Sequence, residues 1–255
     1  MPSLSQIQTA LCDIDGTLID TEGNHDPSLA PAIQEAEERG ARIGLCTNRE
    51  IDFCNKICDL FELNGPIIYE DGASVVVGGE AVPLVPDDER MSCANDLLAR
   101  AVQSRVLPTL AGHPDMTFEF NTKKQYSVSV HCFNYGERAY EFVQDVVPFA
   151  QKLMDEIGGL HVYDTGRGNF IVRYEDSGKG EAIKWLAEEG HIDPERTAVI
   201  GDGVNDVDAF VAIKELGGLA YAVRNAVPEL KKVATATIPH DASLGVVNVL
   251  ERIAQ

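Results

Sequence analysis

The sequence predicts an α/β protein with a Rossmann-like parallel-sheet core and an inserted α+β domain. Two observations support this prediction. Short apolar segments alternate with amphipathic segments near both ends of the chain, which is typical of a parallel sheet covered by helices. Between them, antiparallel hairpins with flanking helices are expected instead. We therefore assign residues 1–82 and 177–255 to the core and residues 83–176 to the insertion.

The N-terminal part shows the alternation clearly. Three short apolar segments predict buried strands, at Ile7 to Leu11, Ala41 to Cys46 and Ile67 to Tyr69. The first helix between them is expected to take Asp26 as its N-cap and Pro27 as its first residue. The apolar side of the second helix should contain Ile51, Cys54, Cys58 and Phe61.

The inserted segment follows a linker around Pro83 and Pro86. Its expected elements are a helix over Cys93 to Leu107, strands within Thr117 to Phe133, a helix over Glu137 to Ile157, and two strands over Leu160 to Asp164 and Asn169 to Tyr174. Pro148 should kink or break the second helix, because proline cannot donate a helical hydrogen bond.

The alternation resumes after Gly178. The expected elements are a helix over Glu181 to Glu189, a strand over Thr197 to Ile200, a helix from Asn205, a strand over Leu219 to Val223, a helix from Pro228 and a last amphipathic helix from Ser243.

Composition excludes several classes of function. The 255-residue chain has a formal net charge of −20, which disfavours binding to nucleic acids and to anionic membranes. Its six cysteines are scattered and form no CxxC pair, and its histidines lack metal-ligand spacing, so a zinc site or disulfide framework is not expected. With no signal-peptide pattern and no apolar run that could span a bilayer, we expect a soluble, cytoplasmic protein.

Acidic and small polar residues follow three of the predicted strands. They are Asp13 with Asp15, Thr47 with Asn48, and Asp202 with Asp206. Ligands bind outside the carboxyl ends of strands in open parallel sheets, so these loops should converge on one crevice if the strands are neighbours. Crowded carboxylates repel one another unless a hard cation neutralises them, and ligands that are all oxygen favour Mg²⁺ over Zn²⁺.

These residues resemble the four motifs of the haloacid dehalogenase (HAD) superfamily of phosphatases. Asp13-Ile14-Asp15-Gly16-Thr17 matches DxDGT, Thr47 matches the second motif, Lys179 the third, and Gly201 to Asp206 the GDxxND fourth. The insertion is similar to the cap of subclass IIB, the Cof-type sugar phosphatases, as is the tail Val223 to Pro228. Two departures are Thr47-Asn48-Arg49 in place of Thr-Gly-Arg, and Asp71-Gly72-Ala73 in place of Asn-Gly-Ala.

The resemblance implies a role for each motif residue. Asp13 would be the nucleophile that forms an aspartyl phosphate, and Asp15 the general acid and base. Thr47, the amides near Asn48, and Lys179 would hold the phosphoryl oxygens.

The resemblance also implies a magnesium site. Asp202 would bind Mg²⁺ directly, together with the Asp13 side chain and the Asp15 carbonyl, while Asp206 would act through water or by orienting Lys179. We expect Asp208 to be structural and Asn225 to be a turn former. Candidates for contacting the rest of the substrate are polar residues near the turns: Arg49 in the core, and Lys123, Lys124, Arg167, Asn169 and Arg173 in the cap.

The predicted function is therefore a magnesium-dependent phosphatase. Its partner would be a small phosphorylated metabolite, such as a sugar phosphate, phosphoglycolate or mannosylphosphoglycerate, and the protein would be a monomer or homodimer. One alternative is a phosphotransferase similar to phosphomannomutase, which needs a bisphosphate activator. Another is a non-catalytic phosphate-binding module, which is disfavoured because every catalytic carboxylate is present.

Overall fold

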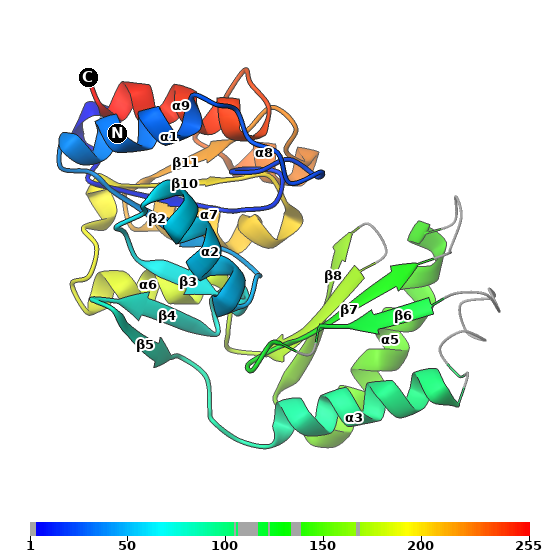
Figure 1. Cartoon of the computed structure of the whole chain (residues 1–255). Coiled ribbons are helices and arrows are strands. Elements are labelled where there is room, and N and C mark those ends of the chain that lie inside the picture. Colours follow the sequence, from blue (N-terminus) through cyan, green and yellow to red (C-terminus); the bar gives the residue numbers. More distant parts are fainter. Residues whose placement is uncertain (1–3, 105, 107–116, 122, 134–138, 167–168) are drawn as a thin grey trace. The chain divides into compact units, whose positions relative to one another are not determined.

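A computed structural model describes residues 4–104, 106, 117–121, 123–133, 139–166 and 169–255 (Figure 1). The chain forms two compact units. Met1–Leu84 and Gly178–Gln255 make up the first, here called the core unit, and Val85–Ser177 makes up the second, the inserted unit.

The core unit contains an eight-stranded sheet in the order β12-β11-β10-β1-β2-β3-β4-β5. Neighbouring strands are parallel from β12 to β3, and the last two pair antiparallel. The strands are β1 (Thr9–Cys12), β2 (Arg42–Cys46), β3 (Ile67–Tyr69), β4 (Ser74–Val77), β5 (Glu80–Pro83), β10 (Thr197–Gly201), β11 (Leu219–Ala222) and β12 (Ala236–Thr237). This mixed α/β fold with a parallel core confirms the predicted fold class.

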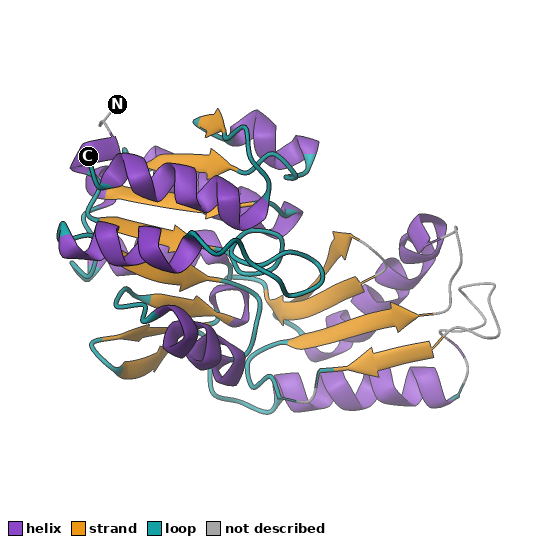
Figure 2. Cartoon of the chain, turned by 45° about the horizontal axis from the view of Figure 1, so that its top comes forward, coloured by secondary structure: helices purple, strands orange, loops and turns teal. Residues whose placement is uncertain are grey.

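Helices cover both faces of the parallel part of this sheet (Figures 1 and 2). On one face α1 packs against α9, and on the other α6 packs against α7. The helices of the core unit are α1 (Leu29–Glu38), α2 (Ile51–Phe61), α6 (Lys179–Glu188), α7 (Val207–Glu215), α8 (Pro228–Val233) and α9 (Ala242–Ile253). Strands covered on both faces need apolar residues throughout, and all four residues of β1 are buried.

The strand register brings the ends of three strands to the same edge of the sheet. In β1, Cys12 is aligned with Ile200 of β10 and with Leu45 of β2. The chain leaves β1 toward β2 in its first half and returns on the other side as β10, so β1 lies at a topological switch point, where α/β proteins bind ligands.

The local structure of the core unit differs from the sequence prediction at several points. Helix α1 begins at Leu29 instead of Pro27, because the Asp26 carboxylate accepts hydrogen bonds from the amide and hydroxyl of Ser28 and folds a turn before the helix. In α2, Ile57 is buried and Cys58 is only half-buried. The β4–β5 hairpin was not predicted, although valines before Gly78 and Gly79 are typical of a strand and turn.

The described residues of the inserted unit form an antiparallel sheet and two helices. Its strands follow the order β6-β7-β9-β8, and it contains α3 (Arg90–Gln103), β6 (Thr117–Phe120), β7 (Val128–Phe133), α5 (Ala139–Ile157), β8 (Leu160–Gly166) and β9 (Asn169–Tyr174). Pro148 lies inside α5, which continues as one helix, so the proline does not break it. Across the described residues, none of the helices combines the length and the apolarity needed to cross a bilayer.

Candidate active site

The site begins where three neighbouring parallel strands end. Asp13 follows β1, Thr47 follows β2, and Asp202 follows β10. Their backbones stay in register beyond the strands: the Asp13 amide donates to the Ile200 carbonyl at 2.9 Å. Asp13, Thr47 and Asp202 are all buried, so the sheet itself fixes where these polar side chains lie.

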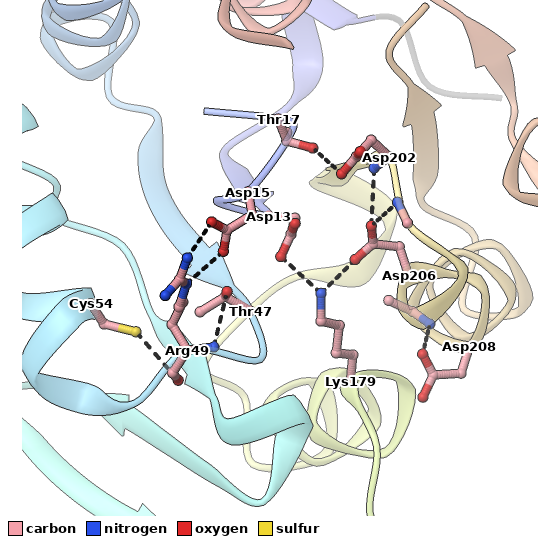
Figure 3. Close-up of polar contacts among 12 residues, drawn as sticks. Asp13, Asp15, Thr17, Thr47, Arg49, Cys54, Lys179, Asp202, Asp206 and Asp208 are labelled. Carbon is pink, nitrogen blue, oxygen red and sulfur yellow. Dashed lines mark hydrogen bonds and ion pairs between the residues drawn. The ribbon is translucent and has the colours of Figure 1, made fainter. Parts of the chain in front are cut away.

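Lys179, the first residue of α6, connects two of the site's carboxylates. Its Nζ lies 2.9 Å from Asp13 Oδ1 and 2.5 Å from Asp206 Oδ1 (Figure 3). The lysine is fully buried, and a buried ammonium is stable only where anionic partners surround it. The structure thus joins residues from three of the four sequence motifs in one network.

The start of α6 is held in place by the turn after β3. Gly72 has φ +88°, and a Cβ there would lie 2.0 Å from the Gly178 carbonyl oxygen. Only glycine fits this combination of positive φ and close approach. The preceding Asp71 is buried, and its charge adds to the larger effects of Asp13 and Asp206 in raising the pKa of Lys179, an interaction the sequence did not predict.

Asp206 organises the loop after β10. Its Oδ2 accepts hydrogen bonds from the Asp202 amide at 3.0 Å and from the Gly203 amide at 2.9 Å, while its other oxygen faces Lys179. Asp206 thus contacts Lys179, the residue that it was expected to orient, and that role stays a prediction. Asp208, expected to be structural, accepts a hydrogen bond from the Ala209 amide (Figure 3).

The Asp202 carboxylate fits a slot formed by the first motif. Thr17 Oγ1 donates to Asp202 Oδ1 at 3.3 Å, and Asn225 Nδ2 lies 3.4 Å from Oδ2. Gly16 has φ +85°, and a Cβ there would lie 2.2 Å from Asp202 Oδ2. Neither Thr17 nor Asn225 was predicted to contact Asp202. For Thr17, its place in the DxDGT motif was the available signal.

The electrostatics of this cluster favour binding of a cation. Burial raises the pKa of the Asp13 carboxyl well above its usual value; Lys179 opposes this rise, and the carboxylates of Asp206 and Asp202 add to it. Burial alone would lower the pKa of Lys179, but Asp13 and Asp206 outweigh burial and raise it. A further positive charge near Asp13 would therefore keep it ionised and nucleophilic.

Asp13, Asp202 and Asp206 form a group that could hold a metal ion. Each offers a carboxylate oxygen, and these oxygens lie within 4.8 Å of one another. When all three are ionised, the single charge of Lys179 leaves two negative charges, which one divalent cation would balance. The donors are all oxygen atoms, the ligand type that Mg²⁺ prefers.

Asp15, the second carboxylate of the first motif, points away from this cluster toward Arg49. Arg49 Nε and Nη2 donate to its two oxygens at 2.7 and 2.6 Å (Figure 3). The guanidinium also lies over the Phe53 ring. The hydrogen bonds that Arg49 donates to Asp15 raise the pKa of Arg49. The pair is roughly half-exposed, so both groups are accessible from solvent.

The structure places the remaining predicted site residues as follows. Thr47 Oγ1 accepts a hydrogen bond from the Arg49 amide at 3.3 Å, and Asn48 is half-buried between them. Arg167 lies outside the described residues. In the inserted unit, Lys124 Nζ donates to Ser129 Oγ, the Lys123 amide donates to Asn121, the Asn169 carbonyl accepts from Thr165, and the buried Arg173 stacks over Tyr163.

Comparison with known proteins agrees with this geometry. The family model described as haloacid dehalogenase-like hydrolase matches residues 10–89 and 113–250, which is most of the chain. The chain belongs to this family. Fold, motifs and relatives together identify it as an enzyme, a phosphatase of HAD subclass IIB.

Similar proteins extend over nearly the full chain. A phosphoglycolate phosphatase from Metallosphaera sedula is 24% identical over 97% of this chain and 99% of its own length. A phosphoglycolate phosphatase from Archaeoglobus fulgidus is 26% identical over 94% of this chain and 93% of its own. A Thermoplasma acidophilum crystal structure shares the fold with a TM-score of 0.74 at 18% identity, covering 97% of this chain and 98% of its own.

Proposed function

We propose that this protein is a magnesium-dependent phosphatase that hydrolyses a small phosphate monoester through an aspartyl-phosphate intermediate. The observation that carries the proposal is the buried cluster in which Lys179 pairs with Asp13 and Asp206 beside Asp202. A buried cluster with two uncompensated negative charges is costly for folding. Mg²⁺ binding would balance these two charges and allow the cluster to hold a phosphoryl group.

The first half-reaction uses two carboxylates of one loop. An Asp13 oxygen attacks phosphorus, the bond from phosphorus to the leaving oxygen breaks, and Asp15 gives its proton to the departing alkoxide. Lys179 and the Thr47 hydroxyl donate hydrogen bonds to the phosphoryl oxygens, whose charge they stabilise.

The second half-reaction regenerates the enzyme. A water oxygen attacks phosphorus while Asp15, now ionised, accepts a proton from this water. The bond from phosphorus to Asp13 breaks, and inorganic phosphate is released. Asp13 and Asp202 would hold Mg²⁺ with the Asp15 carbonyl, while Asp206 orients the loop and Lys179. The metal would supply a Lewis acid that neutralises phosphoryl charge.

The substrate class follows from the relatives and from the exposed arginine. Relatives such as those from M. sedula and A. fulgidus are named phosphoglycolate phosphatases, so phosphorylated small acids are the first candidates and sugar phosphates the second. The guanidinium of Arg49 is half-exposed and offers a planar, bidentate donor for a substrate oxyanion. With a net charge of −20, the protein must attract its anionic substrate through such local groups.

Phosphate release from a panel of phosphorylated metabolites tests the proposal. We expect release with Mg²⁺, none with EDTA, and none from Asp13→Asn. A matched control is Asp52→Asn, an exposed carboxylate in the first turn of α2, which should retain full activity. Acid-quenched Asp15→Asn should carry phosphate on the Asp13 peptide, as located by mass spectrometry.

Two results would contradict the proposal. Phosphate release that persists undiminished in Asp13→Asn would exclude this nucleophile. Isomerisation of a hexose phosphate that depends on an added bisphosphate, with little release of inorganic phosphate, would indicate a phosphotransferase similar to phosphomannomutase instead.

A further inference from the structure

We infer that Asn225 is a positioning residue for the metal site. Its carboxamide does not bind the metal but holds the residues that do. The inference rests on the magnesium site of the proposed function. Asn225 lies in the turn after β11, and its side chain contacts three segments that are far apart in sequence: the loop of the first motif, Asp202 and the start of α9.

The donor side of the carboxamide faces two metal-binding loops. Nδ2 donates to the Gly16 carbonyl at 2.8 Å and lies 3.4 Å from Asp202 Oδ2. The Gly16 carbonyl follows directly after Asp15, whose own carbonyl is a proposed ligand. The carboxamide of Asn225 therefore positions two proposed metal ligands, the Asp15 carbonyl through the backbone next to it and the Asp202 carboxylate directly.

The acceptor side fixes which way the carboxamide points. Oδ1 accepts a hydrogen bond at 2.7 Å from the amide of Ala242, which has the unusual φ of +41°. The Ala242 N–H can only donate and the Gly16 carbonyl can only accept. Oδ1 must therefore face Ala242 and Nδ2 must face Gly16. Nδ2 is thereby always directed toward Gly16 and Asp202.

A second contact ties the same turn to Asp202. The Val227 amide donates to the Asp202 carbonyl at 2.9 Å, so both the backbone and the side chain of Asp202 are held by residues 225–227. Gly16, which lacks a Cβ, leaves the space that Asp202 Oδ2 occupies next to Nδ2. Outer partners of this kind orient metal ligands, and their loss weakens metal binding about 10- to 100-fold.

The neighbouring Arg224 provides a matched control. It pairs with Asp241 through both ends of its guanidinium and so also connects this turn to the start of α9, without contacting Asp202 or Gly16. Arg224→Ala removes a tether of the turn, whereas Asn225→Ala removes the contacts to the metal site. Asn225 is exposed, so its replacement should leave the fold intact.

Titration with Mn²⁺ monitored by electron paramagnetic resonance tests the inference on the full-length protein. We expect Asn225→Ala to raise the Mn²⁺ dissociation constant about tenfold, Asn225→Ser to raise it less, and Arg224→Ala to leave it within about twofold. The Mg²⁺ concentration for half-maximal phosphate release should rise by the same factor as for Mn²⁺ binding, with kcat recovered at saturating Mg²⁺.

The outcomes separate this inference from the proposed function. Wild-type Mn²⁺ affinity in Asn225→Ala, or equal weakening in Arg224→Ala, would overturn the inference even if phosphatase activity is present. Weaker Mn²⁺ binding in Asn225→Ala, in a protein that releases no phosphate from any substrate, would support the inference and overturn the function. Failure of the wild type to bind Mn²⁺ would overturn the inference.

Discussion

Two ion pairs in the same site have similar distances and very different surroundings. Lys179 Nζ lies 2.9 Å from Asp13 Oδ1, and Arg49 Nη2 lies 2.6 Å from Asp15 Oδ1. The Lys179 and Asp13 side chains are 0% and 8% exposed, whereas those of Arg49 and Asp15 are 41% and 46% exposed. Distance alone therefore does not describe what each pair does.

The difference in burial separates two tasks. A buried ion pair lies in a low-dielectric environment, so removing one partner leaves an uncompensated charge at high cost. An exposed pair is screened by water and contributes little to stability. We therefore expect the pair of Lys179 and Asp13 to stay formed, so that it fixes the charge of the site. We expect the pair of Arg49 and Asp15 to separate when a substrate oxyanion competes for the guanidinium.

The largest expected effect comes from breaking the buried pair. Lys179→Met should lower the free energy of unfolding of the metal-free protein by about 3 kcal/mol, because Asp13 and Asp206 lose their shared cation. Phosphate release should fall at least about a hundredfold. Urea unfolding and steady-state kinetics measure the two effects.

The control for this variant lies on the same helix. Lys184 pairs with Glu181 at 2.7 Å, but both side chains are exposed. Lys184→Met should change the free energy of unfolding by less than about 1 kcal/mol and leave activity unchanged. Equal destabilisation by the two variants would contradict the role assigned to burial.

The next effect in size concerns the slot that holds Asp202. Gly16→Ala introduces a Cβ that would clash with Asp202 Oδ2 at a residue with positive φ, and should cost about 1–3 kcal/mol in backbone strain. It should also weaken Mn²⁺ binding. Gly23→Ala has the same strain, with φ +83°, but an open environment, so it should leave Mn²⁺ binding unchanged. Mn²⁺ titration of both variants distinguishes strain from displacement of the ligand.

A smaller effect is expected at the exposed pair. Arg49→Lys keeps the charge but loses the planar donor pair that holds both oxygens of Asp15. The free energy of unfolding should change by less than about 1 kcal/mol, while kcat/KM should fall about tenfold because lysine lacks the planar donor pair that the guanidinium offers to a substrate oxyanion. Arg39→Lys, on the surface after α1, should affect neither quantity. A loss of stability as large as in Lys179→Met would refute the comparison.

The smallest effect belongs to a partly exposed pair in the inserted unit, Arg90 with Asp88. Hydrogen bonds from Arg90 lower the pKa of Asp88 to about 2. Because this folded-state pKa lies below the unfolded value, the contribution of Asp88 to stability is complete above about pH 4 and is lost as the pH falls toward 2. Asp88→Asn should therefore flatten the pH dependence of the urea midpoint below pH 4 slightly. A midpoint that stays equally pH-dependent would contradict the assignment.

Local patterns were sufficient to predict the fold class and the family. Apolar segments ending in Asp13, Thr47 and Asp202 identified strand ends, because a buried parallel strand needs a continuous apolar run and a ligand site needs polar groups just after it. Residue preferences were less reliable at helix borders. They placed the start of α1 two residues early, because the Asp26 side chain forms a turn with Ser28 before the helix.

By itself, the sequence determined the family and the candidate residues for the chemistry, since each motif is a short local pattern in which spacing and residue type are visible. The tertiary structure decided how those residues are paired and exposed. Asn225 meets Gly16 across 209 positions, and Lys179 meets Asp13 across 166. Hydrogen bonds act over a few ångströms, so partners so distant in sequence are brought together only when the strands are ordered in the sheet.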